Sequence, residues 1–270
     1  MKTILITGAS SGIGKETAKL FHAKGWNVIA TMRNPDNEAE LGELENILAT
    51  KLDVLDPASI DNAVNEGIAR FGQIDVLLNN AGYGAYGVLE SFSRGQIIRQ
   101  FDTNVIGLLD VTKALLPHFR TNKSGIIINV SSVGGKMSFP LGTLYHGTKF
   151  AVEGISESLN FEVREFGGQV KIIEPGAIAT DFTSRSLEFS NDESMTEYQP
   201  IIGKLLAATQ AMFEQASPAS VVAGVVYEAA TDGKDQLRYT AGEDAKAVVA
   251  QRQQADDATF TSIIRSQFGL

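Results

Sequence analysis

Tyr145 and Lys149, near the start of a predicted helix over Leu144–Phe166, have the types and spacing that proton transfer requires. Residues four apart share one face of a helix, so the hydroxyl and the ammonium can act on one site. An ordinary tyrosine has a pKa of about 10, and a nearby cation favours its phenolate. A tyrosine tuned in this way can give a proton to a carbonyl, or take one from an alcohol, near neutral pH. The pair indicates general acid–base chemistry.

A hydroxyl suited to holding the reacting oxygen precedes this pair. Ser132 lies 13 residues before Tyr145 and ends a predicted strand over Ile126–Ser131. Its hydroxyl can hydrogen-bond the same oxygen that Tyr145 protonates. A Tyr-x-x-x-Lys pair taken alone has a plainer interpretation, an amphipathic helix with a surface lysine, because such pairs occur by chance on many helices.

A glycine-rich turn, Thr7-Gly8-Ala9-Ser10-Ser11-Gly12-Ile13-Gly14, directly follows the first predicted strand and opens the first helix. Glycine lets the backbone approach a ligand, and a helix N-terminus offers free N–H groups to a pyrophosphate. The spacing Gly-x-x-x-Gly-x-Gly differs from that of the commonest dinucleotide fingerprint. The turn predicts a nucleotide site, and its alternative is a glycine-rich strand–helix turn with no ligand.

Two further segments end strands on the same edge of the predicted sheet. Asn79-Asn80-Ala81-Gly82 follows the strand Ile74–Asn79, and Asp53-Val54 ends the strand Ile47–Leu52. Open parallel sheets bind ligands outside the carboxyl ends of their strands, so these segments reinforce the glycine turn. Asp53 has two interpretations: it caps the next helix, or it accepts a hydrogen bond from an adenine amine.

Alternating short apolar runs and longer helical stretches supply the frame for these residues. Helical periodicity runs over Ile13–Lys24, Ala58–Phe71, Gln96–Phe119 and Leu144–Phe166. Strands are predicted at Thr3–Thr7, Asn27–Thr31, Ile47–Leu52, Ile74–Asn79, Ile126–Ser131, Val170–Glu174 and Leu237–Thr240. The alternation predicts right-handed β-α-β units, and so a single doubly wound α/β domain over residues 1–270 with a parallel sheet covered on both faces.

One stretch, Asp181–Ala216, departs from the alternation. A long insertion in a compact domain is usually a functional lid or a disordered segment. Its aromatic and methionine side chains favour the lid: Phe182, Phe189, Met195, Tyr198, Met212 and Phe213. We expect them to join Tyr83, Tyr86, Phe139 and Leu141 around the reacting oxygen. Such a lining favours a bulky, largely apolar carbonyl compound, unless these side chains only pack the lid onto the sheet.

The composition argues against several kinds of partner and site. The chain has 23 Lys and Arg against 32 Asp and Glu, a net charge of −9, which disfavours a nucleic-acid binder. No apolar run reaches the roughly 18 residues needed to span a bilayer, and no cysteine is present, which fits a reducing compartment. We therefore expect a soluble cytoplasmic protein. Its histidines, His22, His118 and His146, are dispersed, so no metal is predicted.

Taken together, these motifs resemble the short-chain dehydrogenase/reductase family. The matching pieces stand in the family's order over about residues 3–245: Thr7–Gly14, Asp53-Val54, Asn79–Gly82, Asn104, Ser132, Tyr145 with Lys149, and Pro175-Gly176 with Thr180. The resemblance implies a Rossmann-type fold with strand order 3-2-1-4-5-6-7. Its hydroxysteroid and retinol dehydrogenase branch is similar at three segments: Ala30–Arg33, Ser132–Gly135 and Lys149–Gly154.

The resemblance also implies a role for each matching residue. Tyr145 would be the general acid/base, Lys149 would lower its pKa and touch the nicotinamide ribose, and Ser132 would hold the substrate oxygen. Asn104 would hold a water that links Lys149 to solvent, unless it is a buried asparagine that satisfies backbone groups. The implied cofactor-binding residues are Gly8, Ser10, Ser11, Gly12, Ile13, Gly14, Arg33, Asp53, Val54, Asn80, Ala81, Gly82, Tyr145, Lys149, Pro175, Gly176, Ile178 and Thr180, of which Pro175–Thr180 would face the carboxamide. The expected substrate-binding residues are Tyr83, Ser132, Phe139, Leu141, Tyr145 and Phe182.

The choice of cofactor depends on the end of the second strand. NAD enzymes commonly place an acid there to bind the ribose hydroxyls, and by the family spacing that position is Met32. The next residue, Arg33, suits bidentate phosphate recognition, and Ser10 would add a hydroxyl to the same 2′-phosphate. This predicts NADP(H) in preference to NAD(H), unless Arg33 is an exposed loop residue paired with Asp36.

We therefore expect an NADP(H)-dependent carbonyl reductase or alcohol dehydrogenase that moves a hydride between the nicotinamide and a ketone or secondary alcohol. Two alternatives remain: a sugar-nucleotide epimerase or dehydratase, which also uses Tyr-x-x-x-Lys, and a cofactor-binding regulatory protein without turnover. The short chain and the glycine spacing disfavour the first, and the intact Asn104, Ser132, Tyr145 and Lys149 disfavour the second. By analogy with the family, pairing of the fourth and fifth helices predicts a homodimer or homotetramer.

Overall fold

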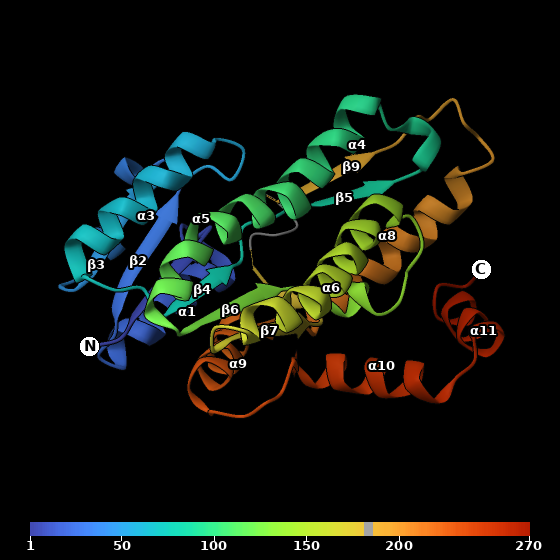
Figure 1. Ribbon diagram of the computed structural model, residues 1–270. Helices are drawn as coiled ribbons and strands as arrows, with labels where there is room; N and C mark the ends of the chain where they lie inside the picture. Colours follow the sequence, from blue (N-terminus) through green and yellow to red (C-terminus); the bar gives the residue numbers. More distant parts are fainter. Residues whose placement is uncertain (181–185) are drawn as a thin grey trace.

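The computed structural model describes residues 1–180 and 186–270, and its centre is a parallel sheet of seven strands (Figure 1). The strand order β11-β7-β6-β4-β1-β2-β3 confirms the predicted order. The strands are β1 (Thr3–Thr7), β2 (Asn27–Met32), β3 (Ile47–Lys51), β4 (Val76–Asn79), β6 (Gly125–Val130), β7 (Gly168–Pro175) and β11 (Arg238–Ala241). Each predicted strand is present, with its ends displaced by at most two residues.

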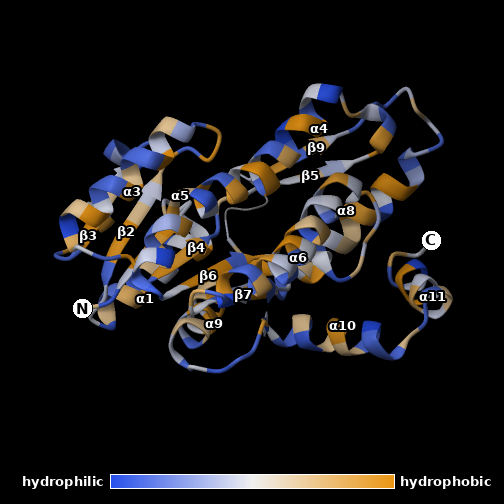
Figure 2. Cartoon of the chain, viewed as in Figure 1, coloured by the Kyte–Doolittle hydropathy of each residue, from blue (hydrophilic) through white to orange (hydrophobic). Residues whose placement is uncertain are grey.

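Helices cover both faces of the sheet because successive residues of a strand point to opposite sides. One face carries α1 (Gly12–Ala23), α2 (Ala39–Gly42) and α9 (Ala219–Thr231), and the other carries α3 (Pro57–Phe71), α5 (Gly107–Asn122) and α6 (Thr143–Arg164). Ile4 and Ile6 pack in the core cluster of the first face, whereas Leu5 between them packs in that of the second. Figure 2 shows the resulting pattern of apolar strands and helices with polar outer faces.

The predicted single helix over Gln96–Phe119 is wrong in its continuity. The chain forms α4 (Arg94–Phe101), a π-helical turn η3 (Asp102–Ile106) and then α5. Ser93 starts α4 with a capping box, in which its hydroxyl accepts from the Gln96 N–H and the Gln96 side chain accepts from the Ser93 N–H. A π-turn inserts an extra residue and is frequent at functional sites. Here it contains the buried Asn104.

The stretch predicted as a lid has regular structure in its described part. β9 (Leu187–Ser190) pairs with β5 (Gly84–Gly87), and α8 (Gln199–Glu214) follows. Gly87 permits this pairing because its φ is +143° and a side chain there would overlap the Ser190 carbonyl oxygen. Two short strands at the ends of this stretch, β8 (Ile178–Ala179) and β10 (Ser217–Pro218), pair with each other. Phe182 lies outside the described residues.

Two C-terminal helices, α10 (Glu243–Gln254) and α11 (Asp257–Gln267), complete the fold. The sequence pattern does not predict them. Phe260 and Ile264 of α11 pack in a third core cluster with Leu205 of α8 and Ala245 of α10. The described residues also form three short 3₁₀ turns, η1 (Pro35–Asn37), η2 (Leu89–Ser91) and η4 (Val133–Gly135). Within residues 1–180 and 186–270, every helix is too short or too polar to span a bilayer.

Candidate active site

The glycine turn after β1 and the turn after β4 are joined by hydrogen bonds at the carboxyl edge of the sheet. The Asn80 amide donates to the carbonyls of Thr7, at 2.9 Å, and Gly8, at 3.1 Å. The Thr7 hydroxyl oxygen accepts from the N–H groups of Asn80 and Ala81, both at 3.0 Å. Gly8 has a φ of +70°, and a side chain on Gly14 would overlap the Gly8 carbonyl oxygen. Glycine is therefore required at both positions.

The N-terminus of α1 fits the pyrophosphate of a dinucleotide. Ser11 is its N-cap in an extended conformation, and in the described part of the chain the Ser11 side chain makes no capping hydrogen bond. The first N–H groups of the helix and the positive end of its dipole are therefore available to an anion. Gly12 has a φ of +53°, and a Cβ atom there would lie 3.3 Å from the Thr180 side chain. A backbone cradle of this kind suits a bound phosphate.

Ser132, Tyr145 and Lys149 come together at the same edge, where β6 ends and α6 begins. The Ser132 hydroxyl accepts from the Gly134 N–H at 3.0 Å and is also hydrogen-bonded to the Tyr145 side chain. The Lys149 ammonium donates to the Val130 carbonyl at 2.9 Å and lies 5.7 Å from the centre of the Tyr145 ring. The structure thus assembles the three side chains in one place, and the catalytic role of each stays a prediction.

Burial determines the protonation of this group. Burial raises the pKa of Tyr145, and the hydrogen bond with Ser132 opposes that rise. Burial lowers the pKa of Lys149 to about 8, although the carboxylate of Glu153 acts in the opposite direction. Lys149 therefore still carries its proton at neutral pH. A cation at this distance favours the phenolate form of Tyr145.

The Asn104 amide binds the backbone of Tyr83. Its oxygen accepts from the Tyr83 N–H at 3.0 Å, and its nitrogen donates to the Tyr83 carbonyl at 2.8 Å. The same nitrogen donates to the Thr148 hydroxyl at 3.1 Å, which ties η3 to the helix of Tyr145 and Lys149. Asn104 is therefore a buried asparagine that satisfies backbone groups, and its part in a proton relay stays a prediction.

The residues expected to select the cofactor lie at the end of β2. Met32 is 3% exposed and packs in the core, whereas the next residue, Arg33, is exposed. Among the ion pairs of the described residues, none joins Arg33 to Asp36. Nearby, Lys15 lies 3.0 Å from a carboxylate oxygen of Glu38. Arg33 is thus an exposed residue at the end of β2, the strand that pairs with β1, which the glycine turn follows.

Asp53 does not cap the following helix, so that interpretation is wrong. The N-cap of α3 is Asp56, whose side chain accepts from the N–H groups of Ala58 and Ser59. Asp53 lies three residues before this cap, and its carboxylate instead accepts from the Leu55 N–H at 3.0 Å. Its role toward an adenine amine stays a prediction.

The loop Pro175–Thr180 is held by a side chain that sequence reasoning missed. The Asp244 carboxylate, at the start of α10, accepts from the Ala177 N–H at 2.8 Å. A side chain on Gly176 would overlap this carboxylate, so glycine is needed there. The Gly176 N–H also donates to the Ala241 carbonyl at 3.2 Å. No motif surrounds Asp244 in the sequence, and only the fold shows that α10 starts beside the end of β7.

Several side chains expected around the substrate contact the first turn of α6 or the strand β5. The Tyr86 ring packs on the Tyr145 ring with centroids 5.3 Å apart. Phe139 packs on His146 at 5.6 Å, and buried His146 accepts from the Phe139 N–H at 3.1 Å. Leu141 has a φ of +59°, and its carbonyl accepts from the N–H that ends β5 at 2.8 Å. Burial raises the pKa of Tyr83. These contacts join the loop before α6 to β5.

Phe189, Tyr198 and Met212 of the predicted lid are not part of the sheet core. The Tyr198 hydroxyl donates to Glu90 at 3.1 Å on the protein surface. Phe189 and Met212 are 37% and 38% exposed. Their packing onto the sheet is therefore incomplete, and their contact with a substrate stays a prediction.

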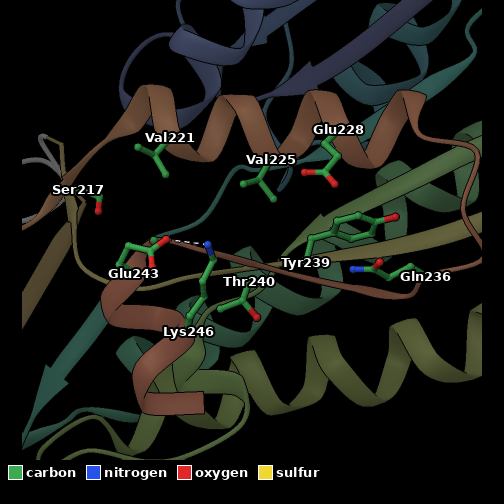
Figure 3. A pocket seen from close by; sticks show the side chains of 10 residues that line it. Ser217, Val221, Val225, Glu228, Gln236, Tyr239, Thr240, Glu243 and Lys246 are labelled. Carbon is green, nitrogen blue, oxygen red and sulfur yellow. Dashed lines mark hydrogen bonds and ion pairs between the residues drawn. The ribbon is translucent and has the colours of Figure 1, made fainter. Parts of the chain in front are cut away.

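Of two hollows in the structure, one lies away from the predicted site, and the other lies beside it at His146, whose ring centre is 5.7 Å from that of Tyr145. Figure 3 shows one of about 340 Å³ between α9, β11 and the start of α10, where Lys246 faces Glu243 at 2.7 Å. No predicted site residue lines it. The other, of about 380 Å³, is lined by Phe139, His146 and Phe150, among others. Across the described residues, no three potential metal ligands of the His, Cys, Asp and Glu types gather in one place.

Comparison with known proteins gives relatives along the whole chain. A family model for short chain dehydrogenases matches residues 2–191. An uncharacterized oxidoreductase of Schizosaccharomyces pombe is 48% identical over 239 residues, which cover 88% of this chain and 100% of that protein. A 3-ketodihydrosphingosine reductase of Bacteroides thetaiotaomicron is 42% identical over 180 residues, 67% of this chain and 65% of that protein.

Solved structures show the same fold. A short-chain dehydrogenase of Streptomyces avermitilis has a TM-score of 0.84 and 33% identity, and the match covers 99% of this chain and 97% of that chain. ElxO with NADP bound has a TM-score of 0.75 and 26% identity, covering 91% and 99%. A short-chain dehydrogenase/reductase of Burkholderia phymatum in complex with NAD matches in fold at 23% identity, with a TM-score of 0.79, covering 93% and 92%. The similarity in sequence and fold identifies the chain as a member of the short-chain dehydrogenase/reductase family of oxidoreductases.

Proposed function

We propose that the protein is an NADP(H)-dependent carbonyl reductase or alcohol dehydrogenase acting on a bulky, largely apolar ketone or secondary alcohol. The observation that carries this proposal is the hydrogen bond of Ser132 with Tyr145, together with the Lys149 ammonium 5.7 Å from the Tyr145 ring. The group lies on the sheet edge that also carries the glycine turn. The chemistry that a nicotinamide bound at this edge would supply is the transfer of the hydride.

The side chains of this chain would manage the proton. Tyr145 gives its hydroxyl proton to the carbonyl oxygen during reduction and takes a proton back from the alcohol during oxidation. Ser132 receives the Gly134 N–H on its oxygen and is hydrogen-bonded to Tyr145. With a substrate bound, its hydroxyl proton would turn to the reacting oxygen. The charged Lys149 stabilises the phenolate that Tyr145 becomes. Spectrophotometric assay of NADPH oxidation with a panel of ketones tests the proposal, and absence of turnover with every ketone would contradict it.

A preference for NADP(H) follows from the end of β2. Met32 cannot accept the ribose hydrogen bonds that an acid accepts, whereas Arg33 offers a planar guanidinium to a 2′-phosphate. We expect NADP(H) to be favoured by about 10- to 1,000-fold, or about 1.4–4 kcal/mol. Structural relatives have been solved with either cofactor, ElxO with NADP and the Burkholderia phymatum protein with NAD, so the proposed preference rests on Met32 and Arg33.

Two variants test the preference directly. Arg33→Ala should weaken NADPH binding and leave NADH binding nearly unchanged, because only the 2′-phosphate loses a partner. Met32→Asp should shift the preference towards NADH, because the new carboxylate repels the phosphate. Equal catalytic efficiency of the wild type with both cofactors would refute the assignment.

The preference for a bulky apolar substrate rests on the rings beside Tyr145 and on the segment 186–216, which we propose covers the site. Tyr86 lies against Tyr145, and Phe139 lies on the loop before α6. A relative at 42% identity bears the name 3-ketodihydrosphingosine reductase, which also indicates an apolar ketone. Catalytic efficiency on an aryl or polycyclic ketone should exceed that on a short sugar ketone. The reverse preference would overturn this substrate class. It would also overturn the expected place of the protein in the hydroxysteroid and retinol dehydrogenase branch.

We further propose a homo-oligomer formed through α5 and α6, in the cytoplasm. Phe161 and Phe150 of α6 are 74% and 46% exposed, and Ile106 at the start of α5 is 48% exposed. Large exposed apolar side chains on neighbouring elements mark an interaction surface. Light scattering after size exclusion should give a dimer or tetramer, and Phe161→Glu should dissociate it. A monomeric wild type would contradict the proposal.

A further inference from the structure

A buried group of charges lies behind Lys149, and the proposed proton transfer does not use it. Glu153, one turn after Lys149 on α6, is 5% exposed, and Glu174 on β7 is 2% exposed. Arg238 on β11 reaches both carboxylates: its Nε lies 2.9 Å from Glu153 Oε2 and 3.3 Å from Glu174 Oε1. Buried carboxylates are costly even when paired, so their position beside the active site calls for a physical reason.

The group is joined to the active-site end of α6 by close packing. Lys149 and Glu153 are four residues apart and share one face of the helix. A Cβ atom on Gly135 would lie 3.0 Å from both Glu153 Cγ and the Lys149 carbonyl oxygen, and 2.6 Å from Ser131 Oγ. The turn η4, which follows Ser132, therefore rests directly on the helical turn between Lys149 and Glu153.

The charges of the group do not balance among themselves. One guanidinium faces two buried carboxylates, and it also binds the exposed Glu157 at 2.5 Å. Among the described residues, Oε1 of Glu153 and Oε1 of Glu174 have no hydrogen-bond partner. Burial, and then the neighbouring Glu153, raises the pKa of Glu174. Among the described ion pairs, none joins Glu153 directly to Lys149, whose ammonium donates to the Val130 carbonyl. The two side chains are therefore related by their separation of one helical turn.

We propose that Glu153 is the counter-ion of Lys149 and that Arg238 sets how strongly its carboxylate acts on the ammonium. Glu153 is a positioning residue, because it acts on Tyr145 only through Lys149. A buried ammonium with a carboxylate one turn away keeps its proton, whereas burial alone favours the neutral amine. The effect on turnover rests on the proposed function, but the effect on the Lys149 ammonium does not.

Other charged or titratable groups surround the pair, and the test must hold them constant. Coulombic action on Lys149 comes from Glu153. Tyr145 acts on the buried Tyr86 hydroxyl, and Lys136 acts on Glu174. The groups that face the pair from the packed elements are Tyr145 and Glu157 on α6, Tyr86 on β5, Lys136 after η4, Glu174 on β7 and Arg238 on β11. The variants below change one of these charges at a time.

The test compares Glu153→Gln and Arg238→Gln with the control Glu157→Gln, which removes an exposed carboxylate from the same helix and the same arginine. NMR of the intact protein with ¹³Cε-labelled lysine follows the Lys149 titration, and Lys149→Met assigns its signal. Glu153→Gln should lower the Lys149 pKa by about one unit, the size expected for one lost nearby charge. Arg238→Gln should raise it, because the Glu153 carboxylate loses its competing partner, and Glu157→Gln should leave it in place.

Opposite shifts in Glu153→Gln and Arg238→Gln distinguish a counter-ion from a packing role. Shifts in the same direction, or no shift in Glu153→Gln, would overturn the proposal. If Glu153→Gln does not fold, as thermal melting would show, the shift in Arg238→Gln decides alone. In ketone reduction, the high-pH limb of Glu153→Gln should move by the same amount as the NMR titration. A wild type without turnover would refute the proposed function and leave the NMR result valid.

Discussion

Removal of the Asp244 carboxylate should loosen the loop expected to face the nicotinamide. This carboxylate accepts from the Ala177 N–H at 2.8 Å and occupies the space above Gly176. A hydrogen bond to a charged group contributes about 1.5–3 kcal/mol, and screening by solvent at the exposed Asp244 reduces this to about 1–2 kcal/mol. At about 1.4 kcal/mol per factor of ten, Asp244→Ala should weaken NADPH binding roughly 5- to 30-fold.

Fluorescence titration with NADPH measures this loss, with two controls from the same helical turn. Asp244→Asn keeps an oxygen acceptor at the same place and should retain most of the affinity. Glu243→Ala removes the neighbouring charge, which pairs with Lys246 at 2.7 Å, and should bind as the wild type does. This role of Asp244 would be refuted if Asp244→Ala bound NADPH as tightly as the wild type, or if Glu243→Ala lost as much affinity as Asp244→Ala.

Three further predictions concern the proton, the glycine turn and pH. Tyr145→Phe removes the transferable proton and should lower turnover about 10²–10⁴-fold with NADPH binding intact; half of the wild-type rate would contradict the mechanism. Gly14→Ala should cost about 1–3 kcal/mol in urea unfolding because its Cβ overlaps the Gly8 carbonyl, whereas Gly224→Ala in open space on α9 should stabilise by up to about 1 kcal/mol. The pKa of Lys149 is about 8 in the folded protein, below its ordinary value of 10.5. Between these two pH values the unfolded chain therefore binds more protons than the folded protein. Lysine burial should therefore make stability rise from about pH 8 to 10.5, and urea midpoints of Lys149→Met should lack that part of the rise.

Much of the frame is determined by patterns local in the sequence. The apolar runs such as Thr3–Thr7 are buried strands because they are short and bounded by turns and helices, and all five residues of β1 are buried. The glycines of the first turn stand where another residue would not fit: Gly8 has a positive φ, and a Cβ atom on Gly14 would overlap the Gly8 carbonyl oxygen. Helix spacing also places Tyr145 and Lys149 on one face.

Tertiary structure decides the features that join distant segments. The π-turn at Asn104 interrupts a continuous helical pattern, and its amide is satisfied by the backbone of Tyr83, 21 residues earlier. Helix α10 has little apolar periodicity, since Ala245 is its buried residue, so its sequence does not predict it. Asp244 acquires its role because α10 begins at the end of β11, beside β7.

The charges behind Lys149 show the same division. The sequence places Glu153 one helical turn from Lys149, but it does not say whether either side chain is buried. That depends on β7 and β11, whose Glu174 and Arg238 arrive from 21 and 85 residues beyond Glu153. The strength of a charge interaction depends on the burial of both partners, because water screens exposed pairs. Sequence spacing therefore determined which groups share a helix face, and only the packed sheet decided which of them interact strongly.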